Sequence, residues 1–265
     1  MSAAPTVTLP FAFAQFPVFL LVFARVAAIV VSMPLLGEAT VPAQVKAAMA
    51  LLLSLLLYPL VGDTFAARVP EAGLMWIPAL VMEVLVGGVI GFTVRLITAA
   101  FEFAGEVAGY VLGLSLAQAV DPQTHLQVPI VGQFLTVLGF LTFLAINAHH
   151  VLIAAMVQSF AWVPPFAPTI GAGFADVLVD LAFNLFRLGL QIAAPVVAAM
   201  LLVNVAMGIV SRAVPQMHVM LVAMPLSIAI GFIVLGVSLP YIGAAMVQAY
   251  GGLDQTLAGV LGSLG

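Results

Sequence analysis

The sequence predicts an all-α membrane protein built from about six long, partly kinked apolar helices. The composition carries this prediction, because 65% of the 265 residues are hydrophobic and only 6% are charged. A soluble domain has about a quarter of its residues charged, and those side chains cover its surface. The mean hydropathy of +1.30 points the same way. We therefore expect residues 1–265 to form a single integral membrane domain, in which the role of the tail, residues 242–265, is uncertain.

Charge and cysteine content exclude several classes of function. The net charge is −4 and the chain has only six lysines and arginines, so it offers no basic patch for nucleic acid. Without cysteine it forms neither disulfides nor thiolate metal sites. The first basic residue is Arg25, so the N-terminal segment lacks the basic start of a secretory signal and is expected to stay in the membrane.

Six segments are long and apolar enough to be considered as spans, since a spanning helix needs about 20 apolar residues. They are Phe11 to Leu36, Ala43 to Val61, Gly73 to Ala100, Val128 to Trp162, Val177 to Val210 and Met217 to Tyr241. Several contain proline or charged residues, which a helix surrounded by lipid tolerates poorly. We therefore expect these helices to pack against protein more than against lipid.

The stretch FEFAGEVAGYVLGLSLAQAVDP at residues 101–122 holds the densest polar information. Gly105, Gly109, Gly113 and Ala117 recur every four residues and form one small-residue stripe on a helix. The stripe is equally compatible with a tight contact to another protein, a pore-facing surface, or ordinary packing within the chain. Glycine lowers helix propensity by roughly 1 kcal/mol per residue, so we also expect this helix to unwind locally.

Four ionisable residues lie in the same part of the chain. Arg95, Glu102 and Glu106 are spaced seven and four apart, which places them on nearly one helical face. Together with Glu83 they could form a proton relay, because ionisable groups at membrane depth are functional candidates. The favoured interpretation is that the three glutamates lie at the membrane interface, pair with Arg95 or contact a neighbouring subunit.

Metal and catalytic chemistry have almost no support in the sequence. The histidines are scattered, and we expect the adjacent His149 and His150 to point to different helix faces. No ligand spacing typical of a metal site, no nucleophile motif and no phosphate or dinucleotide loop is present. The sequence therefore predicts a protein that is not an enzyme and needs no cofactor.

A series of landmarks runs in order from about residue 15 to residue 240. They are Arg25 with Pro34; Pro42 and Lys46 in VPAQVK with Pro59; Glu83, Gly87, Gly91 and Phe92 in EVLVGGVIGF; Gly105 with Glu106; GLSLAQAVDP; Asn147 with His149; and SRAVPQ with Pro225. In order and spacing this series resembles the FliR family of flagellar export-gate proteins and its injectisome relatives in type III secretion. Ala148 departs from the pattern, which has glycine there. The details favour the flagellar branch.

The resemblance implies a non-enzymatic subunit of a protein-conducting channel in the bacterial inner membrane, at the flagellar basal body. Helices of this family form bent hairpins within a helical hetero-oligomeric export gate. The implied partners are FliP-like and FliQ-like gate subunits, FlhB-like and FlhA-like export proteins, and unfolded secreted proteins in transit.

The resemblance also assigns roles to residues. It places a plug of the closed pore in the segment that holds Gly109, Gly113, Leu114, Ser115, Asp121 and Pro122. Asp121 precedes a proline, which independently disfavours continued helix there. The residues expected in helix packing are Gly87, Gly91 and Gly105. Those expected in polar or inter-subunit contacts are Arg25, Lys46, Glu83, Arg95, Glu102, Glu106, Arg212, Pro215 and Gln216.

Two alternatives stay open at this point. The chain could instead be a stand-alone proton-coupled or small-solute transporter that uses Glu83, Arg95, Glu102 and Glu106 as its polar pathway. Arg212, the only ionised residue between Leu188 and Leu253, could anchor a helix end at the membrane surface or bind a partner subunit.

Overall fold

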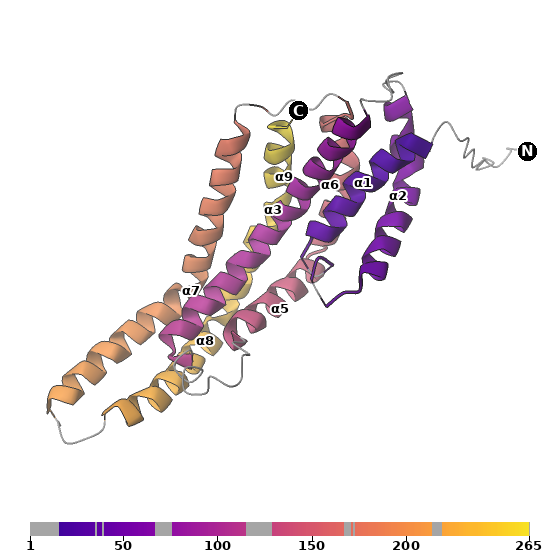
Figure 1. Ribbon diagram of the computed structural model, residues 1–265. Helices are drawn as coiled ribbons and strands as arrows, with labels where there is room; N and C mark the ends of the chain where they lie inside the picture. The colour runs from indigo at the N-terminus through magenta and orange to yellow at the C-terminus, as the bar shows by residue number, and fades with distance from the viewer. Residues whose placement is uncertain are drawn as a thin grey trace, which may run out of the picture. The chain divides into compact units, whose positions relative to one another are not determined.

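The computed structural model describes residues 16–34, 36–38, 40–66, 76–114, 129–166, 171, 173–213 and 219–264. Every regular element in these ranges is a helix, which confirms the predicted all-α fold (Figure 1). The helices are α1 (Phe16–Ser32), α2 (Ala43–Ala66), α3 (Trp76–Val111), α5 (Ile130–Ala145), α6 (Ala148–Trp162), α7 (Phe174–Ala213), α8 (Val219–Gly251) and α9 (Leu253–Gly262).

Most of the predicted spans coincide with these helices. The parts of the chain that the structure describes contain four helices that are long and apolar enough to cross a membrane: Ala43–Gly62, Trp76–Val111, Phe174–Ala213 and Ala223–Gly262. The first predicted segment yields only α1, which has 17 residues. The tail after Tyr241 continues α8 and then forms α9. The prediction of a membrane protein is confirmed, whereas the single domain stays a prediction.

The fourth predicted span is not one helix but two. α5 and α6 meet at a bend of 71°. Asn147 has a φ of 58° at this bend, a left-handed conformation that asparagine adopts more readily than most residues. The amides of Ile146 and Asn147 donate to the carbonyls of Thr142 and Leu144, each over 3.0 Å, so the end of α5 keeps its hydrogen bonds. The segment from Val128 to Trp162 is apolar enough on average to be counted as one span, but its backbone is broken at Asn147.

The expected unwinding of the glycine-rich helix is wrong at two of its three glycines. α3 continues through Gly105 and Gly109 and ends only at Val111. Gly113 follows with a φ of 79°, which an L-residue rarely adopts. The helix therefore tolerates the propensity cost of Gly105 and Gly109, and it ends at Val111, two residues before the third glycine.

Contacts divide the chain into two compact units. The first consists of Met1–Phe92, Ile153–Phe174 and Leu257–Gly265, and the second of Thr93–Leu152 and Ala175–Thr256. In the first unit α1 and α2 lie side by side (Figure 1). The C-terminal helix joins this unit through buried apolar side chains and through a 3.2 Å hydrogen bond from the Gly171 amide to the Ser263 carbonyl.

The second unit has a core of aromatic rings around Tyr250. This ring packs edge-on against Phe101 and Phe143, with centroid distances of 5.5 Å and 5.2 Å. Its hydroxyl lies 3.2 Å from the hydroxyl of Thr98, which gives the polar end of the ring a partner. These contacts bind α3, α5 and α8 together.

The same unit contains a backbone-to-backbone contact between α3 and α5. A Cβ placed on Gly105 would overlap Gly132, 2.5 Å from its amide nitrogen, and would lie 2.7 Å from the Val131 carbonyl oxygen. One turn later a Cβ on Gly109 would meet only the Val131 side chain, at 4.0 Å. The two glycines of one stripe therefore differ, since only Gly105 is required for the close approach.

Large apolar side chains stay exposed along several helices. On α2 they are Val45, Leu51, Leu52, Leu55, Leu56 and Leu60; on the second half of α7 they are Leu201, Leu202, Val205, Ile209 and Val210. Such surface is expected only where lipid or other subunits cover it.

We predict that Gly105→Ala lowers the stability of the protein by about 1–3 kcal/mol, because a rigid backbone stands where the methyl group must go. Gly109→Ala is the matched control on the same stripe and is expected to be neutral or stabilising by about 0.5–1 kcal/mol, since alanine is the better helix former. Thermal unfolding of the purified variants in detergent measures both. Equal midpoints for the two variants would contradict the close approach at Gly105.

Candidate functional site

The most strongly built polar site lies inside the first unit, around Arg25 in the middle of α1. The side chain is fully buried, with 0% of its surface exposed. Its Nε donates to Glu83 Oε2 over 2.5 Å, and one terminal nitrogen donates to Glu83 Oε1 over 3.0 Å. The result is a two-pronged ion pair between α1 and α3, the strongest geometry that an arginine and a carboxylate can form.

The remaining N–H groups of Arg25 bind the end of α6. One terminal nitrogen donates to the Ser159 carbonyl over 2.7 Å and to its hydroxyl over 3.3 Å, and the other donates to the Val163 carbonyl over 2.8 Å. The Ser159 carbonyl also accepts from the Val163 amide over 2.9 Å, and both carbonyls lie at the helix C-terminus, which carries the negative end of the helix dipole. The guanidinium has five N–H groups, and five acceptor contacts satisfy it.

An aromatic ring covers the face of the same guanidinium. The central carbon of Arg25 lies 4.3 Å from the centroid of the Phe160 ring, within the range of a cation–π interaction. Phe160 belongs to the last turns of α6, so this contact and the carbonyl contacts act on one helix end. Together they fix three helices to one side chain.

A second series of residues spaced four apart on α3 allows this helix to approach the site. Glu83, Gly87 and Gly91 occupy successive turns of one face of α3. A Cβ on Gly87 would overlap the Arg25 carbonyl oxygen, and one on Gly91 would lie 2.6 Å from the Ser32 Cβ. The two glycines therefore bring α3 close enough to α1 for Glu83 to reach the guanidinium.

The role of this site is structural. Both carboxylate oxygens of Glu83 accept from Arg25, and Glu83 is only 2% exposed. Burying two charges costs several kcal/mol each, and here the paired geometry and the additional acceptors offset that cost. With all of its N–H groups engaged, the guanidinium holds helices in register and offers no donor to a solute.

The other ionisable residues named from the sequence are not brought to this site. Lys46 donates from Nζ to the carbonyls of Gly37 and Glu38, over 3.1 Å and 2.8 Å, and so closes the turn before α2. Arg212 is exposed in the last turn of α7.

Arg95, Glu102 and Glu106 are exposed on α3, and none of them forms an ion pair with a described residue. The structure therefore pairs Glu83 with Arg25, not with the α3 residues grouped with it from the sequence.

Some predicted residues lie outside the described ranges. They are Ser115, Asp121, Pro122, Pro215 and Gln216. Gly113 and Leu114 are the last plug residues that the structure describes, directly after α3.

The expectation that His149 and His150 point to different helix faces stays a prediction. Their ring centroids lie 4.2 Å apart, and His150 is exposed whereas His149 is half-buried. Among the described residues no group of three histidine, aspartate or glutamate side chains could hold a metal ion.

Sequence reasoning missed the partners of Arg25 in α6 and the pairing with Glu83. Helix C-terminal carbonyls carry no signal in the sequence. The pairing had a signal, because Arg25 is the only charged residue of its apolar segment, and a lone buried charge requires an opposite charge.

Comparison with known proteins shows to which family the chain belongs. The model of the family described as bacterial export proteins, family 1, matches residues 16–253. The chain belongs to this export protein family. All residues that build the Arg25 site lie inside the matched range of the export protein family, from α1 through the end of α6.

Curated relatives in the export protein family are similar over nearly their whole length. A flagellar biosynthetic protein FliR of Bacillus subtilis is 34% identical over 253 residues, which cover 94% of this chain and 96% of the relative. FliR of Caulobacter vibrioides is 38% identical over 228 residues, with 86% and 89% covered. FliR of Escherichia coli is 29% identical over 240 residues, with 91% of each chain covered.

We predict that Arg25→Met destabilises the protein by about 3–5 kcal/mol, because it leaves the Glu83 carboxylate buried without a partner. Arg25→Met combined with Glu83→Leu is expected to recover part of this loss, since no unpaired charge then remains. Detergent unfolding curves of the two single variants and the double variant measure the coupling. Arg95→Met, at an exposed position, is the control and should leave stability within about 0.5 kcal/mol. Additive single losses would contradict the ion pair.

Proposed function

We propose that this chain is a membrane-embedded subunit of the flagellar protein export apparatus. The observation that carries the proposal is the export family match over residues 16–253, together with relatives named for flagellar biosynthesis that align over nearly their full length. A match of this extent leaves little of the chain for a different activity. The membrane-length helices agree with it.

The proposed partners are FliP-like and FliQ-like gate subunits, FlhB-like and FlhA-like export proteins, and unfolded secreted proteins in transit, in the bacterial inner membrane. Support comes from the surface of the single chain. α2 and the second half of α7 expose long apolar faces. The exposed ionisable residues Arg95, Glu102 and Glu106 interrupt a helix of membrane length, where a neighbouring subunit would satisfy them better than lipid.

A stand-alone transporter is not favoured. Its pathway required Glu83 to act with Arg95, Glu102 and Glu106, yet Glu83 is buried and bound on both oxygens by Arg25. The export role uses Glu83 as a structural anchor and needs no relay.

Within the same proposal, the segment from Gly109 through His125 acts as the plug of the closed channel. Gly113 supports this role because its left-handed backbone directs the chain away from the axis of α3. The assignment of Ser115, Asp121 and Pro122 rests on the family resemblance.

Deleting the gene in its own host is expected to abolish flagellin in the culture medium and to restore it when the wild-type gene is supplied. Native mass spectrometry of the tagged protein, purified in mild detergent with its neighbouring gene products, should show one hetero-oligomer of defined mass. A monomer or homodimer under these conditions, or normal flagellin export in the deletion strain, would sink the proposal.

Removing residues 110–120 is expected to make the membrane permeable to ions when the complex is assembled, because the channel would lose its plug. Conductance in planar bilayers measures this, and the mass of the complex is the control for assembly. Unchanged conductance in a normally assembled complex would argue against a plug at this position.

A further inference from the structure

Leu112, the residue directly after α3, is held in a socket formed by Gly231 of α8 and Met200 of α7. Its side chain is fully buried, with 0% of its surface exposed. A Cβ placed on Gly231 would overlap the Leu112 side chain and would lie 3.5 Å from the Met200 sulfur. The space that Leu112 fills therefore exists because residue 231 has no side chain.

This socket is the outermost buried packing contact of the α7–α8 pair. The described residues of α7 after Met200 include none that is buried, and the same holds for those of α8 before Gly231. Segments with few buried contacts are the ones that move most easily in a folded protein. The outer part of the helix pair is therefore anchored to the rest of its unit at Leu112.

Both helices of the pair are interrupted by proline at one level. Pro195 lies four residues after Gln191 and lacks the N–H group that would bind the Gln191 carbonyl. The hydroxyl of Tyr241, directly after Pro240 of α8, donates to this carbonyl over 3.5 Å. Helices bend at such positions, and Figure 1 shows that α7 changes direction near its middle. The outer part of the pair can therefore pivot at this level.

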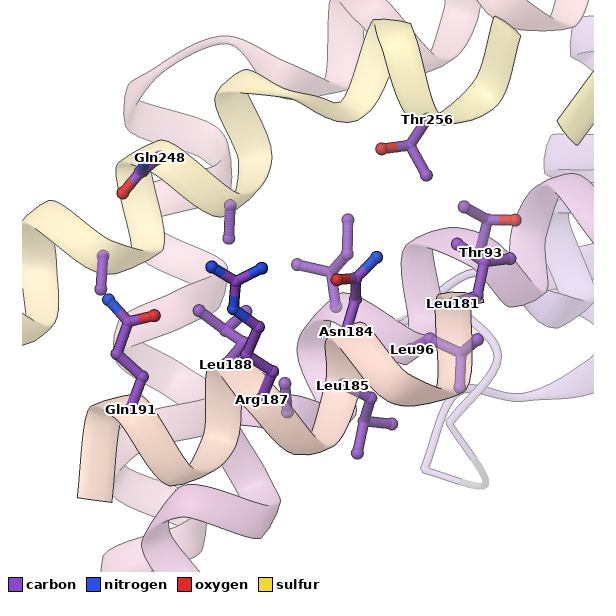
Figure 2. Close-up of a pocket in the computed structure, with 14 residues that line it drawn as sticks. Thr93, Leu96, Leu181, Asn184, Leu185, Arg187, Leu188, Gln191, Gln248 and Thr256 are labelled. Atoms are coloured by element: carbon purple, nitrogen blue, oxygen red, sulfur yellow. The ribbon is translucent and has the colours of Figure 1, made fainter. Parts of the chain in front are cut away.

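A hollow of about 280 Å³ lies on the inner side of the two prolines (Figure 2). Gln191 of α7 and Gln248 of α8 stand on facing sides of it. The two helices are thus not tightly packed against each other there, and this space allows the pair to bend.

We propose that the α7–α8 pair is a latch that holds the export channel closed through Leu112. In the closed channel the socket retains Leu112, and the channel opens only after the outer part of the pair has moved off this side chain. The inference rests on the proposed plug, because Leu112 belongs to the segment from Gly109 through His125. It adds the contact in the same chain that keeps the plug in place.

Gly231→Ala is expected to raise the ion conductance of the assembled complex in planar bilayers about tenfold, because the added methyl group displaces Leu112 from its socket. Leu112→Ala should also raise it, since this variant removes the side chain that the socket retains and introduces no overlap. Gly243→Ala is the matched control on α8, because a Cβ there would meet nothing within 4 Å, and it should conduct as wild type does. The mass of each complex verifies assembly.

A disulfide at the socket tests whether the latch has to open. The chain has no cysteine, so a pair introduced there is unique within it. A Cβ on Gly231 would lie 3.0 Å from the Leu112 Cγ, the atom that a sulfur replaces in Leu112→Cys, so Leu112→Cys with Gly231→Cys has a spacing suited to a disulfide. Oxidation of cells with this double variant is expected to abolish flagellin export, and dithiothreitol should restore it. The two single variants are the controls for the oxidant.

Wild-type conductance of the assembled Gly231→Ala and Leu112→Ala complexes would overturn the latch, when removal of residues 110–120 does open the channel. Export that continues through the oxidised double variant would overturn it as well. A channel that stays closed without residues 110–120 would overturn the plug on which the latch depends, so the two failures are distinguishable.

Discussion

The first unit of this protein depends on one buried guanidinium. Arg25 binds α3 through Glu83 and the end of α6 through two carbonyls and a hydroxyl, so a single side chain determines how three helices meet. In a medium without water a polar group must find its partner inside the protein. This requirement makes the contact directional, and the close approach at Gly87 and Gly91 restricts the same helices further.

The helices of the two units pack through different kinds of contact. Around Arg25 a charge is matched by a charge, and Gly87 and Gly91 only permit the approach. Between α3 and α5 the backbones themselves touch at Gly105 and Gly132, with no polar side chain involved. Small residues and paired charges are the two devices that work where apolar side chains gain nothing by leaving lipid. α3 uses the first device along its whole length and adds the second near its start.

The sequence predicted the fold class and most helices correctly, because long apolar runs are a strong signal in a chain with so few charges. The prediction failed where the structure depends on local backbone geometry. The bend at Asn147 lies inside a predicted span, and one left-handed residue occupies it. Gly105 and Gly109 misled in the opposite direction, since their low helix propensity predicts unwinding and α3 continues through both.

The candidate site was only half predictable, for a related reason. Arg25 and Glu83 were recognisable individually as charges in apolar segments. Their pairing depends on which face of α3 meets α1, and the spacing of Glu83, Gly87 and Gly91 encodes that face. The acceptors on α6 are backbone carbonyls, which every residue possesses, so nothing in the side-chain pattern marks them.

The separation of these partners along the chain also governs how the protein can be made. Arg25 leaves the ribosome 58 residues before Glu83 and 134 residues before Ser159. Until then α1 is a 17-residue segment, shorter than the bilayer, with an uncompensated charge that costs about 2.5–3.5 kcal/mol at the membrane centre. Among the described helices, α1 is made first, and we expect that it is not the first to settle. We expect α1 to take its final depth only after α3 has supplied the carboxylate and the end of α6 has supplied the remaining acceptors.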